Sequence, residues 1–216
     1  MRVLLVGAPG AGKGTQAKLL EDRLKKPHIS SGDLLREAVE RETELGMKAK
    51  EYMDRGQLVP DSVLIGAMRE RLHEPDCHGG FLLDGFPRTV RQAEALEDAL
   101  AEMSAKLDAV VMIDVPEKAL IARLSGRRTC RNCGALFHQE LDPPAHEGVC
   151  DRCGGELFQR DDDSEKTIRE RLAVYERTTK PLLRWYADRG ALAVVDGVGD
   201  QSDVLDRILA CVEGSA

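Results

Sequence analysis

The N-terminal segment contains the feature that most restricts the fold. An apolar run, RVLLVG at 2–7, leads directly into the glycine-rich stretch GAPGAGKGTQ at 7–16. Gly7, Gly12 and Lys13 fit the pattern G-x-x-x-x-G-K, in which glycines let backbone N–H groups converge on phosphate oxygens while the lysine adds a full charge. A helix starting near Lys13 adds its positive N-terminal end. The stretch predicts a strand, a phosphate-binding loop and a helix, rather than a merely tight strand-to-helix turn.

One detail departs from the common form of this loop. A Ser or Thr usually follows the lysine at once and binds Mg²⁺ through its hydroxyl, but here Gly14 lies between Lys13 and Thr15. Direct binding of Mg²⁺ by Thr15 is therefore left open by the sequence.

The rest of the chain alternates short apolar runs with amphipathic stretches, which is typical of a parallel sheet flanked by helices. The expected strands are 2–7, 81–84, 109–115 and 192–196, with the short HIS run at 28–30 as a fifth. Apolar residues at helical spacing are expected to face the core; they are Val90, Ala93, Leu96, Leu100, Met103, Ile168, Leu172, Tyr175, Leu182 and Tyr186.

Helix boundaries are predicted at three positions. Pro181 should kink or end a long helix that begins near Ser164, because proline lacks the N–H and crowds the preceding turn. Asp61 and Ser202 are predicted to cap the N-termini of helices.

Composition and charge exclude several classes of function. With 216 residues and 42% apolar content, one main domain carrying insertions is expected. A formal net charge of −7 argues against a general nucleic-acid or anionic-membrane binder. No run approaches the roughly 20 apolar residues that span a bilayer, and the apolar N-terminal run is short for a secretory signal. We therefore expect a soluble, cytoplasmic protein with neither nucleic-acid nor membrane partners.

A segment at 127–160 interrupts the alternation, since it is poor in aliphatic residues and rich in Cys, Gly, Pro, His and Arg. CRNC at 130–133 and CDRC at 150–153 give the spacing C-x₂-C-x₁₆-C-x₂-C, which favours a tetrahedral, structural Zn²⁺ held by Cys130, Cys133, Cys150 and Cys153. Free thiols or a redox pair are the alternatives, and His138 or His146 would be ligands only in a mixed site. Cys77 and Cys211 stand alone and are interpreted as incidental thiols.

Several motifs, in this order over almost the full length, give the chain a family resemblance. They are GAPGAGKGTQ at 7–16, SSGDLLR at 30–36, GQLVPD at 56–61, FLLDGFPRT at 81–89 with Gln92 beyond, GRR at 126–128, and RDDD at 160–163 with Arg171 beyond. The chain resembles the adenylate kinase family, in the form whose long lid carries zinc. The combination of DGFPR with the loop GAPGAGKGT is highly specific.

The resemblance implies reversible transfer of the terminal phosphoryl group of Mg·ATP to AMP, giving two ADP, by a monomer. It also implies a core of 1–29, 60–126 and 161–216, an AMP-binding segment at 30–59 and a lid at 127–160. The core would be a five-stranded parallel sheet of the P-loop type. Direct in-line transfer is expected, because phosphoryl transfer depends mainly on positioning and charge neutralisation.

Site residues follow by motif match from the same resemblance. The expected ATP-binding residues are Gly10, Ala11, Gly12, Lys13, Gly14, Thr15, Arg123, Arg127, Leu136, Phe137 and Gly199. The expected AMP-binding residues are Ser31, Arg36, Gln57, Leu58, Val59, Gly85, Phe86, Pro87, Arg88, Gln92, Arg160 and Arg171. Lys13, Arg88, Arg127, Arg160 and Arg171 are the expected catalytic residues.

Some positions differ from the family pattern or allow two interpretations. Ser31 stands where the family usually has Thr, and Gly199 where a longer side chain is frequent. Asp84 either anchors Mg²⁺ through water or caps the GFPR turn. Asp162 and Asp163 are either lid-hinge carboxylates or merely favourable residues at the start of the following helix.

Two other functions remain as alternatives. A kinase for UMP or CMP is disfavoured by the long cysteine-bearing lid and by Gln92. A zinc-ribbon binding module attached to a nucleotide switch would need a basic or aromatic ribbon surface. This ribbon offers Phe137 and Phe158, but it also carries acidic residues, among them Asp142, Glu147, Asp151 and Glu156.

Overall fold

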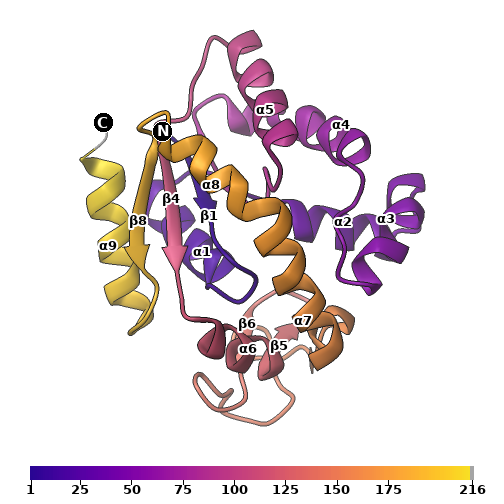
Figure 1. Ribbon diagram of the computed structural model, residues 1–216. Helices are drawn as coiled ribbons and strands as arrows, with labels where there is room; N and C mark the ends of the chain where they lie inside the picture. The colour runs from indigo at the N-terminus through magenta and orange to yellow at the C-terminus, as the bar shows by residue number, and fades with distance from the viewer. Residues whose placement is uncertain (215–216) are drawn as a thin grey trace.

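A computed structural model describes residues 1–214, which form two sheets and the helices around them (Figure 1). The strands are β1 (Arg2–Val6), β2 (His28–Ser30), β3 (Phe81–Asp84), β4 (Ala109–Asp114), β5 (Arg127–Cys130), β6 (Leu136–His138), β7 (Leu157–Phe158) and β8 (Leu192–Asp196). The α-helices are α1 (Lys13–Leu24), α2 (Ser31–Glu40), α3 (Glu44–Asp54), α4 (Asp61–Leu72), α5 (Val90–Glu102), α6 (Glu117–Ser125), α7 (Glu165–Val174), α8 (Lys180–Ala187) and α9 (Gln201–Glu213). Shorter helical turns are η1 (Pro75–Cys77), η2 (Asp161–Asp163) and η3 (Tyr175–Thr179).

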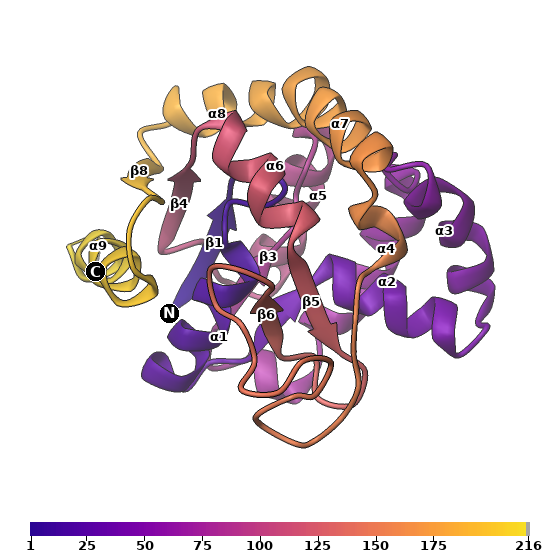
Figure 2. The ribbon, with the colours of Figure 1, turned by 90° about the horizontal axis from the view of Figure 1, so that it is seen from below.

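The larger sheet is parallel, with the strand order β2-β3-β1-β4-β8. Its central strands, β3, β1 and β4, are mostly apolar and largely buried, as expected for a sheet covered on both faces. Helices α1 and α9 cover one face, and the α7–α8 rod crosses the other, as the two ribbon views show (Figures 1 and 2). The fold class and all five strands of this sheet agree with the sequence-based prediction.

The register of the strands brings three chain segments to one edge of the sheet. Leu5 pairs with Asp84, and Ser30 pairs with the same residue from the other side, so β1, β2 and β3 end together. In open parallel sheets, ligands bind beyond the carboxyl ends of the strands. The glycine-rich loop after β1, the start of α2 and the loop after β3 therefore meet at the place where a ligand is expected.

The long C-terminal helix is interrupted where proline was expected to disturb it. Regular α-helix stops at Val174, the π-helical turn η3 follows, and α8 restarts at Lys180 with Pro181 in its first turn. The wider turn accommodates the missing N–H of Pro181 without ending the helix. The chain thus continues as one bent rod across the sheet.

Two predicted helix caps are wrong. The N-cap of α4 is Pro60, and Asp61 lies in the first turn with its side chain directed to α5 instead of to its own backbone. The N-cap of α9 is Asp200, two residues before Ser202. In both cases a polar residue one or two positions inside the helix was mistaken for the cap.

The segment 127–160 forms a small antiparallel sheet of its own, with the order β6-β5-β7. Its buried cluster comprises only Cys130, Ala135, Cys150 and Leu157, with Phe137 packed against it. So small an apolar cluster cannot stabilise an independent unit, which is the usual reason for a metal or disulfide in such segments. Among residues 1–214, no helix combines the length and apolar character needed to cross a membrane.

Candidate functional site

The phosphate-binding loop surrounds the side chain of Lys13. Lys13 Nζ donates hydrogen bonds to the carbonyl oxygens of Gly7 and Ala8, at 2.9 and 3.0 Å, so the ammonium group folds back over the loop. Gly12 has φ of 95°, and a Cβ built there would meet no atom within 4 Å. The loop is therefore open toward the cavity at Gly12, and only glycine adopts this backbone conformation without strain.

Lys13 lies in an electropositive environment. Burial is the main cause that lowers the pKa of Lys13 to about 8; Arg88, Arg171 and Arg127 lower it further, and Asp84 opposes them. An anion bound beside Lys13 would relieve this unfavourable placement of positive charge. The site is thus poised for a polyanion.

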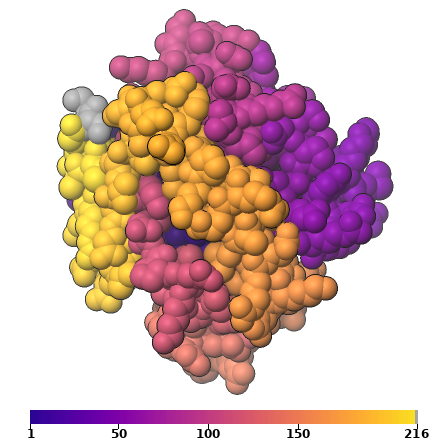
Figure 3. Space-filling model, viewed as in Figure 1, coloured from indigo at the N-terminus to yellow at the C-terminus, as the bar shows by residue number. Residues whose placement is uncertain are grey.

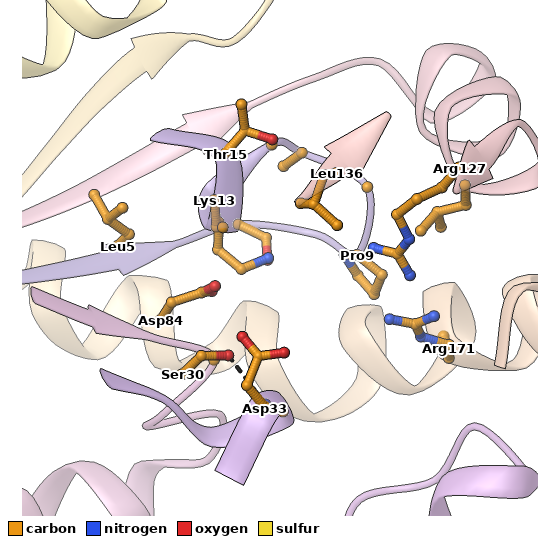
Figure 4. A pocket seen from close by; sticks show the side chains of 18 of the residues that line it. Leu5, Pro9, Lys13, Thr15, Ser30, Asp33, Asp84, Arg127, Leu136 and Arg171 are labelled. Atoms are coloured by element: carbon orange, nitrogen blue, oxygen red, sulfur yellow. Dashed lines mark hydrogen bonds between the residues drawn. The ribbon is translucent and has the colours of Figure 1, made fainter. Parts of the chain in front are cut away.

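A single cavity of about 590 Å³ is lined by this loop and by six arginines. The arginines come from six different places in the chain: Arg36 on α2, Arg88 after β3, Arg123 on α6, Arg127 on β5, Arg160 before η2 and Arg171 on α7. Figure 4 shows Arg127 and Arg171 close together on the side of Pro9, with Asp84 near Lys13. The space-filling view shows a hollow between the segments of α6 and α7–α8, with indigo N-terminal atoms at its base (Figure 3).

Acidic residues hold several of these arginines in place. Arg127 is bound by both oxygens of Asp163, at 2.8 and 2.6 Å, and Arg171 contacts Asp162 at 2.9 Å and Asp163 at 3.1 Å. Arg36 pairs with Asp33 at 2.6 Å. The acidic run thus acts as a set of charge partners in the turn η2, and not as the first turn of α7, which begins at Glu165.

The arginines are costly to bury, as their pKa values indicate. Burial lowers the pKa of Arg88 to about 10 and that of Arg160 to about 9, and neighbouring guanidinium groups contribute to both shifts. Both remain positively charged at neutral pH. Buried, mutually repelling cations that line an open space are a strong indication of an anionic ligand.

The loop after β3 is organised by the carbonyl oxygen of Gly85. This oxygen accepts hydrogen bonds from Ser31 Oγ at 2.6 Å and from Arg88 Nε at 2.7 Å. The adjacent Phe86–Pro87 peptide bond is cis. Gln92 accepts from the backbone N–H of Arg88 at 2.7 Å and donates to Asp61 at 2.6 Å.

Asp84 stands at the junction of the loop and the sheet. A Cβ built on Gly14 would lie 3.3 Å from Asp84 Oδ2, so the carboxylate directly adjoins the phosphate loop. Burial alone would raise the pKa of Asp84, but His28 and Lys13 lower it, and the result lies below the usual value. His28 Nε2 is 3.7 Å from Asp84 Oδ2.

The four cysteines of 127–160 lie together, as the sequence predicts. Their sulfur atoms are all within 4.8 Å of one another, with 3.5 Å between Cys130 and Cys153 and 3.6 Å between Cys133 and Cys150. A disulfide would need about 2.05 Å. The four thiols therefore form a cluster that could hold one metal ion.

Neither histidine belongs to this cluster. His138 Nδ1 accepts from the backbone N–H groups of Glu140 and Leu141, so its Nε2 carries the proton and donates to the Ala122 oxygen at 3.1 Å. The His138 ring thereby ties β6 to α6.

Nearly all residues predicted to contact ATP or AMP line the one cavity. Phe86 is the exception: it is 2% exposed and belongs to the main core, and it does not line the cavity. The cavity also includes residues that the motif match did not select, among them Lys18, Asp33 and Gln201. Asp33 lies within the quoted motif at 30–36, whereas Lys18 and Gln201 carry no distinguishing sequence signal.

Comparison with known proteins agrees with this geometry. The family model described as adenylate kinase matches residues 5–191. Curated adenylate kinases are 54 to 55% identical: that of Archaeoglobus fulgidus over 99% of this chain and 98% of its own length, that of Syntrophobacter fumaroxidans over 97% and 99%, and that of Caldicellulosiruptor bescii over 97% and 97%. This chain belongs to the adenylate kinase family.

Membership gives the coarse function. As an adenylate kinase the chain is an ATP:AMP phosphotransferase, which interconverts ATP and AMP with two ADP. The individual contacts with ATP and AMP remain predictions, which are based on the residues that line the cavity.

Proposed function

We propose that phosphoryl transfer occurs directly between two nucleotides bound end to end in the single cavity. The ATP phosphates would lie on residues 10–15, and AMP against Ser31, Arg36, Arg88, Gln92 and the backbone of 57–59. One observation carries this proposal: the phosphate loop and the six arginines line the same cavity, although they come from separate elements.

Electrostatics would supply most of the catalysis. A phosphate charge about 4 Å from a guanidinium gains about 4 kcal/mol at an effective dielectric of about 20, and each arginine fork can bind two phosphate oxygens. Lys13, Arg88, Arg127, Arg160 and Arg171 would together neutralise the transferring group, which is the main demand of this reaction. The low solvent exposure of Arg160 and Arg171, at 11 and 16%, would strengthen these contacts.

Mg²⁺ would enter with ATP near Asp84 and Thr15. Both offer oxygen donors, which this ion prefers, and Asp84 is a buried carboxylate beside the loop. The ion would supply neutralisation of the phosphate charge, while Asp84 would hold its position, most simply through water.

The cysteine cluster would hold a structural Zn²⁺. Tetrahedral geometry with Zn–S bonds of about 2.3 Å separates sulfurs by about 3.8 Å, close to the shorter distances in the cluster. Backbone N–H groups of Cys133 and Asn132 hold the pKa of Cys130 well below its usual value, whereas the neighbouring thiols outweigh a backbone N–H group of Gly155 and raise the pKa of Cys153. Reduced thiols of this kind suit a cytoplasmic setting.

Residues 127–160 would act as a lid, with 30–59 as the AMP-binding segment and 1–29, 60–126 and 161–216 as the core. The lid contacts the core where Lys18 Nζ donates to the Gly134 oxygen at 2.5 Å and Gln201 Nε2 donates to Asp142 at 3.3 Å. Arg160 Nη2 lies 3.9 Å from Asp33 in the AMP-binding segment. Closure would exclude water, which competes as an acceptor, and the adenylate kinase lid is itself the standard illustration of such closure.

We also propose that a monomer suffices, because one chain supplies both halves of the cavity. A coupled assay for ADP formation from ATP with AMP, CMP or UMP tests the acceptor. We expect AMP to be preferred by orders of magnitude. Equal or better turnover of CMP or UMP would show that the acceptor site is that of a pyrimidine nucleotide kinase. Absence of ADP formation with every acceptor would overturn the proposal.

A further inference from the structure

The side-chain amide of Gln92 is held between two neighbours of fixed hydrogen-bonding character. Its Oε1 accepts from the backbone N–H of Arg88 at 2.7 Å, and its Nε2 donates to Asp61 Oδ1 at 2.6 Å. A backbone N–H can only donate, and an ionised carboxylate can only accept. Just one of the two orientations of the amide satisfies both neighbours. Gln92 is fully buried yet lines the cavity wall.

Asp61 is itself fixed by a second hydrogen bond. Its Oδ2 accepts from Thr89 Oγ1 at 3.1 Å, and the same hydroxyl oxygen caps α5 by accepting from the Gln92 backbone N–H at 3.2 Å. Asp61 thus joins the first turn of α4 to the first turn of α5. It does not line the cavity and cannot touch a ligand there. Any effect of Asp61 on a ligand must therefore pass through Gln92.

We propose that Asp61 is a positioning residue that sets the base selectivity of the acceptor site by locking the orientation of the Gln92 amide. The inference rests on the proposed placement of the AMP base against Gln92. After its two internal bonds, the amide keeps one N–H and one lone pair of Oε1, side by side. A base that presents an acceptor nitrogen beside an exocyclic amine matches this pair. Adenine has that pattern at its N1 and N6 positions.

A 6-oxopurine presents the reverse pattern, with an N–H beside an oxygen. To bind it, the Gln92 amide would have to turn over. Oε1 would then face the Asp61 carboxylate, and the NH₂ group would face the Arg88 N–H, in contacts that are now 2.6 and 2.7 Å long. Both are repulsive pairs in a buried place, where an unmade hydrogen bond is costly. The two neighbours therefore exclude the 6-oxopurine nucleotide, and Asp61 supplies one of the two barriers.

The test is the substitution Asp61→Asn, which keeps the size and shape of the side chain. Asparagine offers both an acceptor and a donor, so Gln92 can turn over on that side. We expect the ratio of kcat/KM for AMP to that for inosine monophosphate to fall at least tenfold, mainly through a lower KM for inosine monophosphate. Asp61→Ser, whose hydroxyl also donates or accepts, is the second variant in case the first does not fold, and the same direction is expected.

Two control variants separate this effect from loss of structure. Thr89→Val removes the other hydrogen bond of Asp61 and the cap of α5 but leaves the carboxylate facing Gln92, so stability should fall while the ratio stays unchanged. Glu70→Gln removes a carboxylate at an exposed position of α4, the helix of Asp61, and should change neither stability nor the ratio.

The outcomes distinguish this inference from the proposed function. If Gln92→Ala weakens AMP turnover but the Asp61 variants keep the wild-type ratio, the positioning role is wrong and the acceptor site stands. An equal fall in the ratio of kcat/KM values in Thr89→Val would also overturn the positioning role of Asp61, because a general loss of stability would then explain the fall. If Gln92→Ala leaves the KM for AMP unchanged, the base does not lie at Gln92. The positioning role of Asp61 and the proposed placement of AMP against Gln92 would then both be wrong.

Discussion

Asp163 binds the guanidinium group of Arg127 with both carboxylate oxygens, at 2.8 and 2.6 Å, from a side chain with no solvent exposure. Oδ1 of Asp163, which accepts the shorter of these two hydrogen bonds, also accepts a hydrogen bond from Arg171 Nη1 at 3.1 Å. One buried carboxylate therefore holds two arginines of the cavity, from β5 and α7, close to each other. The positions of both guanidinium groups depend on this residue.

We predict that Asp163→Asn lowers both stability and activity. Removing one partner of a buried ion pair costs about 3 kcal/mol, because the remaining charge is left uncompensated. We also expect kcat/KM to fall at least tenfold, as two arginines lose their orientation. Urea unfolding and the ADP assay measure these effects. Asp161→Asn, at the exposed start of the same turn, is the control, and equal behaviour of the two variants would refute the role of Asp163.

The affinity for nucleotide phosphates should depend on pH through Lys13. In the free protein its pKa lies at about 8, mainly because of burial, and bound phosphates would raise that value. Below pH 8 Lys13 is protonated in both states, so affinity is unaffected. Above pH 8 binding must take up a proton, and affinity for ADP should fall by up to about tenfold per pH unit. Titration calorimetry between pH 7 and 9.5 measures this.

Lys13→Arg is the matched variant for the pH dependence, since the ordinary pKa of arginine lies at least about two units above that of lysine, so the guanidinium should lose its charge at a higher pH than Lys13. This variant is expected to bind ADP more weakly, but its affinity for ADP should depend less on pH. A wild-type profile that is flat to pH 9.5 would show that Lys13 does not titrate as described.

Gly85→Ala should impair the acceptor side of the cavity selectively. Gly85 has φ of 76°, and an added Cβ would lie 2.9 Å from Ser31 Oγ and 3.0 Å from Arg88 Nη2. The KM for AMP should rise at least tenfold, with little change in the KM for ATP. Gly190→Ala is the control, because φ there is 67° but an added Cβ meets nothing within 4 Å. Both variants carry the backbone strain of about 1–2 kcal/mol, so a similar KM for AMP in both would contradict the contact argument.

Metal removal should loosen residues 127–160. We expect about one zinc per chain in protein purified without chelator, and a lower Tm after chelation, since the apolar cluster there is too small to replace the metal. Cys150→Ser should lose the metal and reproduce the lower Tm. Cys211→Ser, on α9 outside the cluster, should retain zinc. Zinc-free protein with an unchanged Tm would rule out a structural metal.

The sequence predicted the parallel strands because β1, β3 and β4 are mostly buried and leave apolar runs, and because the edge strand β8 is also largely apolar. The short strand β2, His-Ile-Ser, carries a weaker signal. It also predicted the glycine-rich loop and the cysteine cluster, whose geometry follows from local spacing. The position of Pro181 also predicted a disturbance of the helix, but proline alone does not indicate that it takes the form of the π-helical turn η3.

Other features depend on contacts between distant segments and carry no local pattern. Asp61 does not cap its own helix because its hydrogen-bond partners, Thr89 and Gln92, are the N-cap and a first-turn residue of α5. Phe86 belongs to the motif DGFPR, but its side chain is buried in the core. The hydrogen bond from Lys18 to Gly134 joins α1 to the segment 127–160 across 116 positions in the sequence.

The most direct test of the central claim is a crystal structure with a bisubstrate mimic, two adenosines joined by a chain of phosphates. We predict that the phosphate chain runs from Lys13 to Arg88, with Arg127, Arg160 and Arg171 around its middle. A mimic that binds with its phosphates away from Lys13 and Arg88 would contradict the account.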